Sequence, residues 1–268
     1  MTRDVLIQQI RDRKSYLCVG LDTDPARIPK HLNDLPDPLF TFNKQIIDAT
    51  LDLCVSYKIN TAFYEALGSK GWDLLERTCA YIPKTHFKIA DAKRGDIGNT
   101  SDQYAKAFFE TMDFDAVTVA PYMGEDSIKP FLDYPGKWTI VLALTSNKGS
   151  SDFQQQELGD KYLYQEVINK VCKWGSKENL MLVVGATRTE QLADIRKLAP
   201  DNFFLVPGVG FQGGSLSEVS KTAITNDIGL LVNVSRAIIY AGDSENYAME
   251  ARAIARQYQY EMEPYIKT

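Results

Sequence analysis

Short runs of apolar and β-branched residues alternate with longer stretches of helical period from one end of the chain to the other. Buried parallel strands read as continuous apolar runs, and strands that alternate with helices are joined by parallel crossovers. The runs that we interpret as strands cover residues 15–22, 57–64, 86–93, 116–122, 138–145, 180–186, 203–210 and 229–235. The helices expected between and after them cover residues 38–53, 71–82, 100–112, 125–132, 154–174, 189–198, 216–225 and 247–265.

Eight such units in a chain of 268 residues match the size and element count of a (β/α)8 TIM barrel, a fold of the α/β class. A doubly wound open sheet is the alternative architecture. Because no linker, composition break or low-complexity tract interrupts the pattern, we expect a single domain over residues 1–268. Its barrel core would span about 15–240, with a C-terminal helix at about 246–266.

The charge distribution excludes several classes of protein. The first thirteen residues carry five charges and no apolar core, so we expect no secretory signal. The longest uncharged stretch, 202–217, contains Pro207 and four glycines, whereas a spanning helix needs about 20 apolar residues. The net charge is -5 and no dense block of lysine and arginine is present. We therefore expect a cytoplasmic protein without a nucleic-acid or membrane partner.

Cysteine and histidine are too sparse and too scattered for most metal or nucleophilic chemistry. The two histidines are His31 and His86, and the four cysteines show no CxxC or Cys/His ligand spacing, so a zinc site or a histidine-based triad is not expected. We interpret the cysteines as free thiols of a reducing compartment; they are Cys18, Cys54, Cys79 and Cys172. Any enzymatic site must then use carboxylates, lysines and arginines, and we expect no metal or other cofactor.

The densest polar cluster lies at the end of the third expected strand. There Asp91 and Lys93 are two residues apart and should share a face, whereas Gly95 lets the chain turn and point Asp96 elsewhere. Read alone, this set could be a solvated turn with ion pairs worth about 0–1 kcal/mol. Asp22 and Lys58 belong to the first and second strands, and all of these groups could converge on one pocket, because barrel sites form at the carboxyl ends of strands.

Two further strand ends could bind a ligand. The loop after the seventh strand contains a G-x-G-x-x-G run at 208–213, but a dinucleotide fingerprint is disfavoured because only one strand follows it. In barrels the loops after strands seven and eight commonly bind phosphate, and Arg236 follows the eighth strand. A tight turn is the simpler explanation for the glycines. The polar loop 144–151 after the fifth strand is either a ligand contact or an ordinary surface loop.

The order of these motifs resembles the orotidine 5′-phosphate decarboxylase family. Residues 91–97 read DAKRGDI, which is similar to the family's D-x-K-x-x-D signature in the form found in one bacterial subgroup. The resemblance extends over about 15–240. It implies cofactor-independent decarboxylation of orotidine 5′-monophosphate to UMP and CO2 in de novo pyrimidine biosynthesis.

The resemblance also implies a role for each matching residue. Asp91 would face the substrate carboxylate and Lys93 would protonate C6 of the pyrimidine. Lys58 and Asp96 would complete the alternating charges, with Lys58 and Asp22 contacting the ribose. The remaining residues would bind the rest of the substrate: Gln212 and Arg236 the phosphate, with Pro207 and Gly208 in the same loop region, and Ser146 the pyrimidine edge.

In the family, the residues that match Asp96 and Thr100 come from the neighbouring subunit, so the resemblance implies a homodimer with shared active sites. Two other functions stay open. One is a different phosphosugar barrel lyase, either a sugar-phosphate decarboxylase or an aldolase in which Lys93 or Lys58 forms a Schiff base. The other is a nucleotide-binding barrel without catalytic activity.

Overall fold

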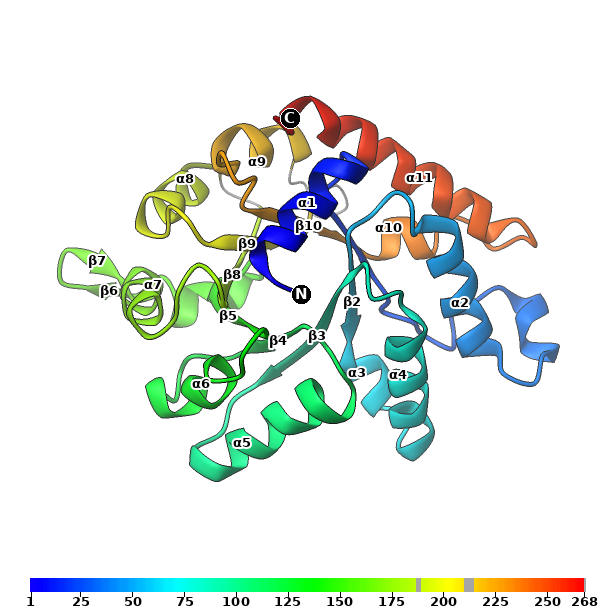
Figure 1. Ribbon diagram of the computed structural model, residues 1–268, viewed down its shortest axis with the longest axis horizontal. Helices are drawn as coiled ribbons and strands as arrows, with labels where there is room; N and C mark the ends of the chain where they lie inside the picture. The colour runs from blue at the N-terminus through cyan, green and yellow to red at the C-terminus, as the bar shows by residue number, and fades with distance from the viewer. Residues whose placement is uncertain (187–188, 210–214, 268) are drawn as a thin grey trace.

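A computed structural model of the protein describes residues 1–186, 189–209 and 215–267. Within these residues, eight parallel strands close into a barrel, each hydrogen-bonded to its neighbours in chain order, with the last paired to the first (Figure 1). The strands are β1 (Leu17–Gly20), β2 (Ser56–Asn60), β3 (Phe87–Arg94), β4 (Ala116–Val119), β5 (Trp138–Leu144), β8 (Leu180–Val184), β9 (Phe203–Pro207) and β10 (Leu230–Val234). Closure of the sheet confirms the barrel and excludes the open sheet.

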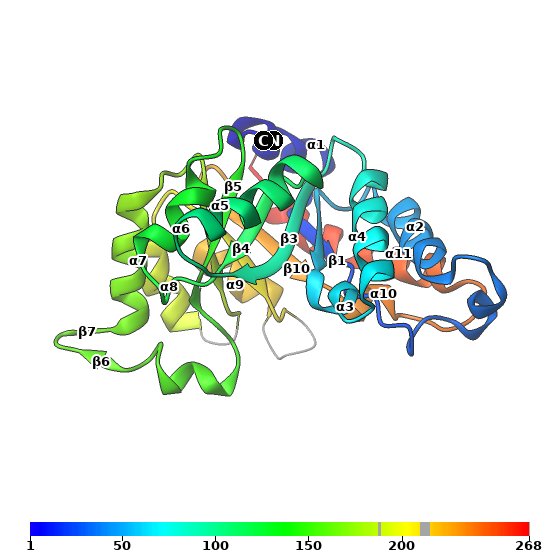
Figure 2. The same cartoon turned by 90° about the horizontal axis from the view of Figure 1, so that it is seen from below.

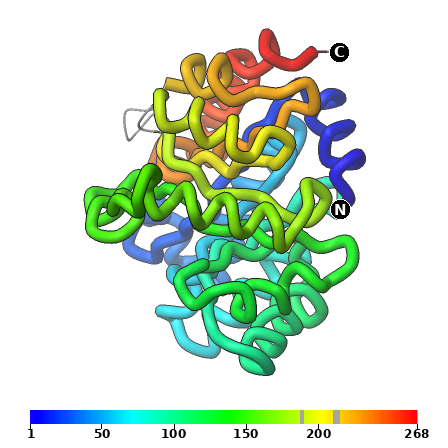
Figure 3. The backbone as a smooth tube through the Cα atoms, turned by 90° about the vertical axis from the view of Figure 1, so that its left-hand side faces the viewer, coloured from blue at the N-terminus to red at the C-terminus, as the bar shows by residue number. Residues whose placement is uncertain are grey.

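Helices form a layer around the outside of the barrel, as the views in Figures 1 and 3 show. The helices are α1 (Arg3–Arg13), α2 (Pro38–Thr50), α3 (Thr61–Glu65), α4 (Ser69–Tyr81), α5 (Gly98–Lys106), α6 (Glu125–Leu132), α7 (Leu163–Trp174), α8 (Thr189–Leu198), α9 (Leu216–Ala223), α10 (Arg236–Ile239) and α11 (Tyr247–Met262). Short 3-10 helices cover Lys30–Asp34, Lys148–Asp152 and Glu263–Tyr265, and a π-helix, Ala107–Thr111, extends α5. The strands are buried almost throughout because these helices cover their outer faces.

The segment after β5 differs most from the sequence-based expectation. A helix was expected from residue 154, but α7 begins at Leu163. The preceding residues form a 3-10 helix and the two-stranded hairpin β6 (Glu157–Leu158) and β7 (Lys161–Tyr162). Gly159 in the hairpin turn has a φ of +69°, a conformation that favours glycine. The hairpin projects from the left-hand side of the molecule in Figure 2, well away from the two termini at the top.

Three helices were not expected from the sequence. α3 covers residues that the sequence analysis assigned to the second strand, which ends at Asn60. α1 buries Leu6 and Ile10 across the amino-terminal end of the barrel, but its five charged residues obscure the apolar face. α10 has four residues and directly follows β10. These helices are short, so their stability comes from packing on the barrel rather than from helical propensity.

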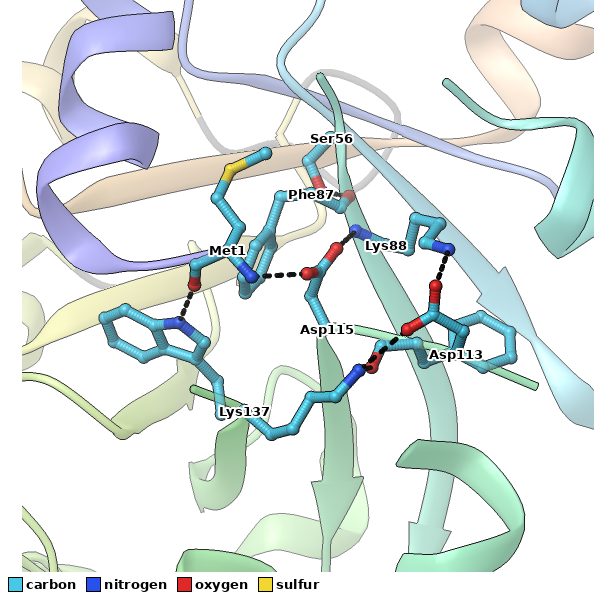
Figure 4. A network of polar contacts seen from close by, with 9 residues as sticks. Met1, Ser56, Phe87, Lys88, Asp113, Asp115 and Lys137 are labelled. Carbon is cyan, nitrogen blue, oxygen red and sulfur yellow. Dashed lines mark hydrogen bonds and ion pairs between the residues drawn. The ribbon is translucent and has the colours of Figure 1, made fainter. Parts of the chain in front are cut away.

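The amino-terminal end of the barrel is filled with aromatic side chains. The ring of Trp138 packs edge-to-face with Phe87 at 6.0 Å and with Phe203 at 6.3 Å between ring centroids. The indole N–H of Trp138 donates to the carbonyl oxygen of Met1, and the Met1 amino group pairs with Asp115 at 2.6 Å (Figure 4). This packing closes one end of the barrel, so the opposite, carboxyl end is where a ligand cavity can form.

Three sequence expectations concern thiols, membranes and metals. The four cysteines are free, with Cys18, Cys54 and Cys79 buried and Cys172 half-buried. No helix in the described part of the chain is both long and apolar enough to cross a membrane. Over the same residues, no group of three His, Cys, Asp or Glu side chains is arranged to hold a metal ion.

His86, directly before β3, ties that strand to α2 in its neutral form. Its Nε2 lies 2.7 Å from the carbonyl oxygen of Leu51, so Nε2 carries the hydrogen and donates it. Its Nδ1 lies 3.2 Å from the hydroxyl of Thr85, and its ring packs against Tyr57 with centroids 5.4 Å apart. Burial lowers the pKa of His86 from 6.5 to about 4.

Neutral His86 therefore makes stability depend on pH. Because the unfolded chain binds the proton more tightly, this contribution is complete above pH 6.5 and is lost as the pH falls toward about 4. We expect the difference in unfolding free energy between the wild type and His86→Gln to shrink by about 2 kcal/mol between pH 7 and pH 4.5. Urea unfolding at several pH values measures it. His31→Gln changes the exposed histidine, and its unfolding free energy should depend on pH as that of the wild type does. If the unfolding free energy of His86→Gln also ran parallel to that of the wild type across this pH range, the prediction would be contradicted.

Candidate active site

A cavity of about 320 Å³ opens at the carboxyl ends of the barrel strands. Most of the residues singled out from the sequence line it, although they come from strands far apart in the chain. The expected residues in its wall are Asp22, Lys58, Asp91, Lys93, Ser146, Pro207, Gly208 and Arg236. The barrel thus brings the charged strand ends and the loops after β9 and β10 into one site.

Three expected site residues are not placed in this cavity. Asp96 is half-buried and lies just after the end of β3. Its Oδ1 accepts a hydrogen bond from the backbone N–H of Ile97 at 2.8 Å. Thr100 is exposed in the first turn of α5. Neither lines the cavity of its own chain. Gln212 lies outside the described residues, as do Gly210 and Gly213 of the glycine run.

Asp91 lies at the centre of a row of alternating charges. Its Oδ1 accepts a hydrogen bond from the Lys93 ammonium at 2.6 Å, and its Oδ2 accepts one from the Lys58 ammonium at 2.9 Å. On the far side of Lys58, Oδ1 of Asp22 lies 3.5 Å from Nζ, an ion pair without a hydrogen bond. Lys58 is 4% exposed, whereas the Lys93 side chain is 49% exposed and open to a ligand.

The two central charges stabilise each other against burial. Burial would lower the pKa of the Lys58 ammonium, but the carboxylates of Asp22 and Asp91 outweigh it and hold that pKa above its ordinary value. Burial would also raise the pKa of Asp91, but the charges of Lys58 and Lys93 hold it well below its usual range. Lys58 is therefore protonated and Asp91 ionised throughout the neutral pH range.

Asp91 and Lys93 meet as expected, but not by alternation along a regular strand. Lys93 has a φ of +48°, in the left-handed region that non-glycine residues rarely adopt. The pairing of β3 with β4 shifts register between Ala90 and Arg94. The chain therefore leaves strand geometry at Lys93, two residues before Gly95, and this reversal brings the Lys93 ammonium back onto Asp91. Sequence periodicity could not show it, because the shift depends on how two strands pair.

The Arg236 side of the cavity depends on a close approach between β1 and the end of β10. A Cβ atom on Gly20 would lie 1.8 Å from Oγ of Ser235, so only glycine allows β1 to pack here. Ser235 precedes Arg236, the first residue of α10. Gly208, directly after β9, has a φ of +90°. The two loops thereby bring backbone groups and a guanidinium to one side of the cavity, a combination suited to an anion.

Ser146 lines the side of the cavity formed by the loop after β5. The backbone of Ser146 packs so closely on Gly185, after β8, that a Cβ there would lie 2.9 Å from the Ser146 nitrogen. Gln154, which follows the 3-10 helix, accepts the backbone N–H of Thr145 at 2.8 Å through its side-chain oxygen. Two contacts thus hold the start of the long polar loop, one at Thr145 and one at Ser146. Ser146 lies in the cavity wall, where the sequence suggested.

Several cavity residues were not singled out as site residues from the sequence. The polar ones among them are Asn60, Thr145, Asn147 and Asn233, and the apolar ones include Leu142, Val183 and Leu205. Most of them lie in the last residues of a strand or shortly after one. The rule that barrel sites form at strand carboxyl ends could have found the polar group, whereas the apolar residues are indistinguishable from core residues in sequence.

Comparison with known proteins shows which family the chain belongs to. Residues 15–251 match the model of the "Orotidine 5'-phosphate decarboxylase / HUMPS family". The chain is 57% identical to an orotidine 5′-phosphate decarboxylase of Christiangramia forsetii, over 98% of this chain and 97% of the relative. It is 54% identical to that of Bacteroides fragilis, over 100% of this chain and 99% of the relative.

A solved structure agrees with these relatives. The structure of Leishmania donovani OMP decarboxylase shares 37% sequence identity, covers 97% of this chain and 99% of its own, and superposes with a TM-score of 0.82. Both the sequence relatives and this structure cover the described cavity and the full barrel. The chain therefore belongs to the orotidine 5′-phosphate decarboxylase / HUMPS family and is an enzyme of the carboxy-lyase class.

Proposed function

We propose that this enzyme converts orotidine 5′-monophosphate to UMP and CO2, with Lys93 as the proton donor. The observation that carries the proposal is the placement of the half-exposed Lys93 ammonium, held by Asp91, in the same cavity as Arg236. A substrate with a carboxylate at one end and a phosphate at the other fits this distribution of charge. The named relatives support the same reaction.

The proposed step breaks one C–C bond and forms one C–H bond. The bond between C6 of the pyrimidine and its carboxylate breaks, the electron pair stays on C6, and CO2 leaves. The Lys93 ammonium transfers a proton to C6 and is reprotonated from solvent. Because C6 has no adjacent carbonyl into which the electron pair readily delocalises, the preorganised positive charge of Lys93 must stabilise it. Each 1.36 kcal/mol of such stabilisation raises the rate about tenfold.

Asp91 contributes a fixed negative charge beside the scissile group. Its low pKa keeps it ionised when the substrate binds, so the substrate carboxylate would be forced close to a like charge. Loss of CO2 relieves that repulsion, while Lys58 holds Asp91 in place from the buried side. Repulsion of the reactant and stabilisation of the C6 carbanion both lower the barrier in this arrangement.

Phosphate binding would supply the energy for this unfavourable contact. Arg236 and the loop after β9 line the cavity across the barrel from β3, because β9 and β10 are far from β3 in the ring of strands. A guanidinium can hold a phosphate through two parallel hydrogen bonds. Binding energy from this remote group can then be used to press the carboxylate against Asp91. We propose that Gln212, Pro207 and Gly208 contribute to the same phosphate contact and that Ser146 contacts the pyrimidine.

We further propose that two copies of the chain share their active sites. Asp96 and Thr100 do not line the cavity of their own chain, although both follow the signature strand directly. Ile97, between them, is an exposed apolar residue at 53% exposure, as expected for a contact with another subunit. In such a homodimer, Asp96 would continue the alternating charges of the partner's site and Thr100 would contact the substrate bound there.

The alternative aldolase reaction is less compatible with the geometry. A Schiff base forms from a neutral amine, usually in an apolar setting. Lys93 is paired with Asp91 at 2.6 Å, and Lys58 is held between two carboxylates. The two carboxylates favour the ammonium form of Lys58, which cannot attack a carbonyl, and Asp91 already engages the Lys93 nitrogen.

Removal of the Lys93 ammonium tests the proposed chemistry. We expect purified protein to deplete the ultraviolet absorbance of orotidine 5′-monophosphate, and Lys93→Ala to lower kcat by about 10³-fold or more, because the general acid is lost. Lys106→Ala, at an exposed position of α5, is the matched control and should turn over normally. Absence of turnover by the wild type would overturn the proposal, and a borohydride-trapped lysine adduct would favour the aldolase.

Arg236→Ala tests the phosphate contact. We expect kcat/KM for the nucleotide to fall about 10- to 100-fold, because a charged hydrogen bond contributes roughly 1.5–3 kcal/mol. The weak turnover of orotidine, which has no phosphate, should stay nearly unchanged. Arg256→Ala on α11, an exposed arginine, should affect neither substrate. Equal losses on nucleotide and nucleoside would show that Arg236 is structural.

Mixed dimers test the shared sites. Asp96→Ala and Lys93→Ala should each be nearly inactive alone. After subunit exchange, half of the dimers would be hybrids with one intact site of two, so about a quarter of the wild-type activity should return. Exchange is verified by native mass spectrometry of a tagged chain. No recovery despite proven exchange would place Asp96 in the site of its own chain.

A further inference from the structure

The bulge of β3 faces a single residue of β4. Ala90 pairs with Val117 and Arg94 pairs with Val119, so the three residues 91–93 lie opposite Thr118 alone. A bulge of this kind leaves backbone groups without their regular ladder partners. The two charged residues of the proposed reaction, Asp91 and Lys93, both belong to this bulge.

The Thr118 side chain takes over the missing contacts. Its hydroxyl oxygen accepts the backbone N–H of Lys93 at 2.9 Å, and the same hydroxyl donates to Oδ1 of Asp91 at 3.0 Å. The direction is unambiguous, because a backbone N–H can only donate and an ionised carboxylate can only accept. Thr118 is 1% exposed and does not line the cavity, so it acts on the site through Asp91 and Lys93.

We propose that Thr118 is a positioning residue that holds Lys93 in its left-handed conformation and aims its ammonium at the reacting carbon. The inference rests on the proposed function and adds a residue to it. One hydroxyl joins the backbone of Lys93 to the carboxylate that the Lys93 ammonium also contacts. The Lys93 side chain is thereby anchored at both ends to one rigid unit, and a strained backbone conformation at a functional residue persists only when its surroundings enforce it.

Loss of the hydroxyl should affect chemistry more than binding. In Thr118→Val the shape is retained, but the Lys93 N–H loses its acceptor and Asp91 loses one donor. The strained turn can then relax and shift the ammonium from the reacting carbon. Arg236 begins α10 and Asp22 follows β1. No hydrogen bond given above joins either of them to Thr118 or to the bulge, so phosphate and ribose binding should persist.

The experiment compares Thr118→Val with Thr118→Ser, which retains the hydroxyl, and with Thr139→Val. Thr139 on neighbouring β5 is also fully buried, but its hydroxyl has no hydrogen-bond partner among the described residues, so it controls for removing a buried hydroxyl from the barrel. We expect kcat of Thr118→Val to fall about 10- to 100-fold, because a catalytic group displaced by about 1 Å costs that much. The KM, and the UMP affinity measured by calorimetry, should change less than threefold, about 0.65 kcal/mol.

Thr118→Ser should recover most of kcat, and Thr139→Val should leave it unchanged. Wild-type kcat in Thr118→Val, or equal losses in the Val and Ser variants, would overturn the inference while the proposed function stands. If Thr118→Val does not fold, Thr118→Ala against Thr118→Ser makes the same comparison.

Crystal structures of the Val and Ser variants give a readout that does not depend on turnover. In the Val variant, Lys93 should leave positive φ or its Nζ should move away from Oδ1 of Asp91, and in the Ser variant both should stay. An unchanged Lys93 in the Val variant would overturn the positioning role even if the wild type proved inactive on orotidine 5′-monophosphate, the result that would separately overturn the proposed function.

Discussion

The buried carboxylate of Asp91, held between two ammonium groups, is the interaction on which the rest of the site depends. A carboxylate removed from water is costly unless it is paired and hydrogen-bonded, and Asp91 has Lys58 on one oxygen and Lys93 on the other. Removing one partner of such a pair typically costs about 3–5 kcal/mol, because the remaining charge stays buried. The two lysines come from the adjacent strands β2 and β3, so the parallel pairing of these two strands is what brings the three charges together.

Local irregularities at the carboxyl end are supported by the regular packing of the other end. Lys93 is left-handed, the β3–β4 register shifts, and Gly20 allows β1 to approach within contact of Ser235. Each departs from ideal strand geometry and would be unstable in isolation. The aromatic cluster around Trp138 and the cap formed by α1 hold the strands at the opposite end. The barrel can therefore tolerate irregular backbone where the chemistry needs it.

The sequence predicted the barrel because its strands are buried on both faces and read as continuous apolar runs. It also predicted that Asp22, Lys58 and Asp91 could meet in one pocket, since each belongs to one of the first three strands or follows it closely and the carboxyl ends of barrel strands converge. It could not predict the bulge, because register depends on pairing between β3 and β4 rather than on either strand alone. It missed α1, whose charged residues mask its apolar face, and the hairpin β6–β7, whose two-residue strands have no detectable period.

The negative net charge of the chain does not indicate that the site attracts an anion, because the cations of the site line one cavity while most carboxylates lie elsewhere. The whole chain carries -5, yet the charged side chains described in the cavity wall are three cations, Lys58, Lys93 and Arg236, against Asp22 and Asp91. Surface charges farther than a Debye length of about 8 Å are largely screened, so the ligand experiences the local excess of positive charge. Two of those cations are already paired with Asp91. In the proposed reaction, attraction for the substrate would therefore come mainly from Arg236, at the end of the cavity remote from the bond that breaks, while the charges at the reacting end stay balanced.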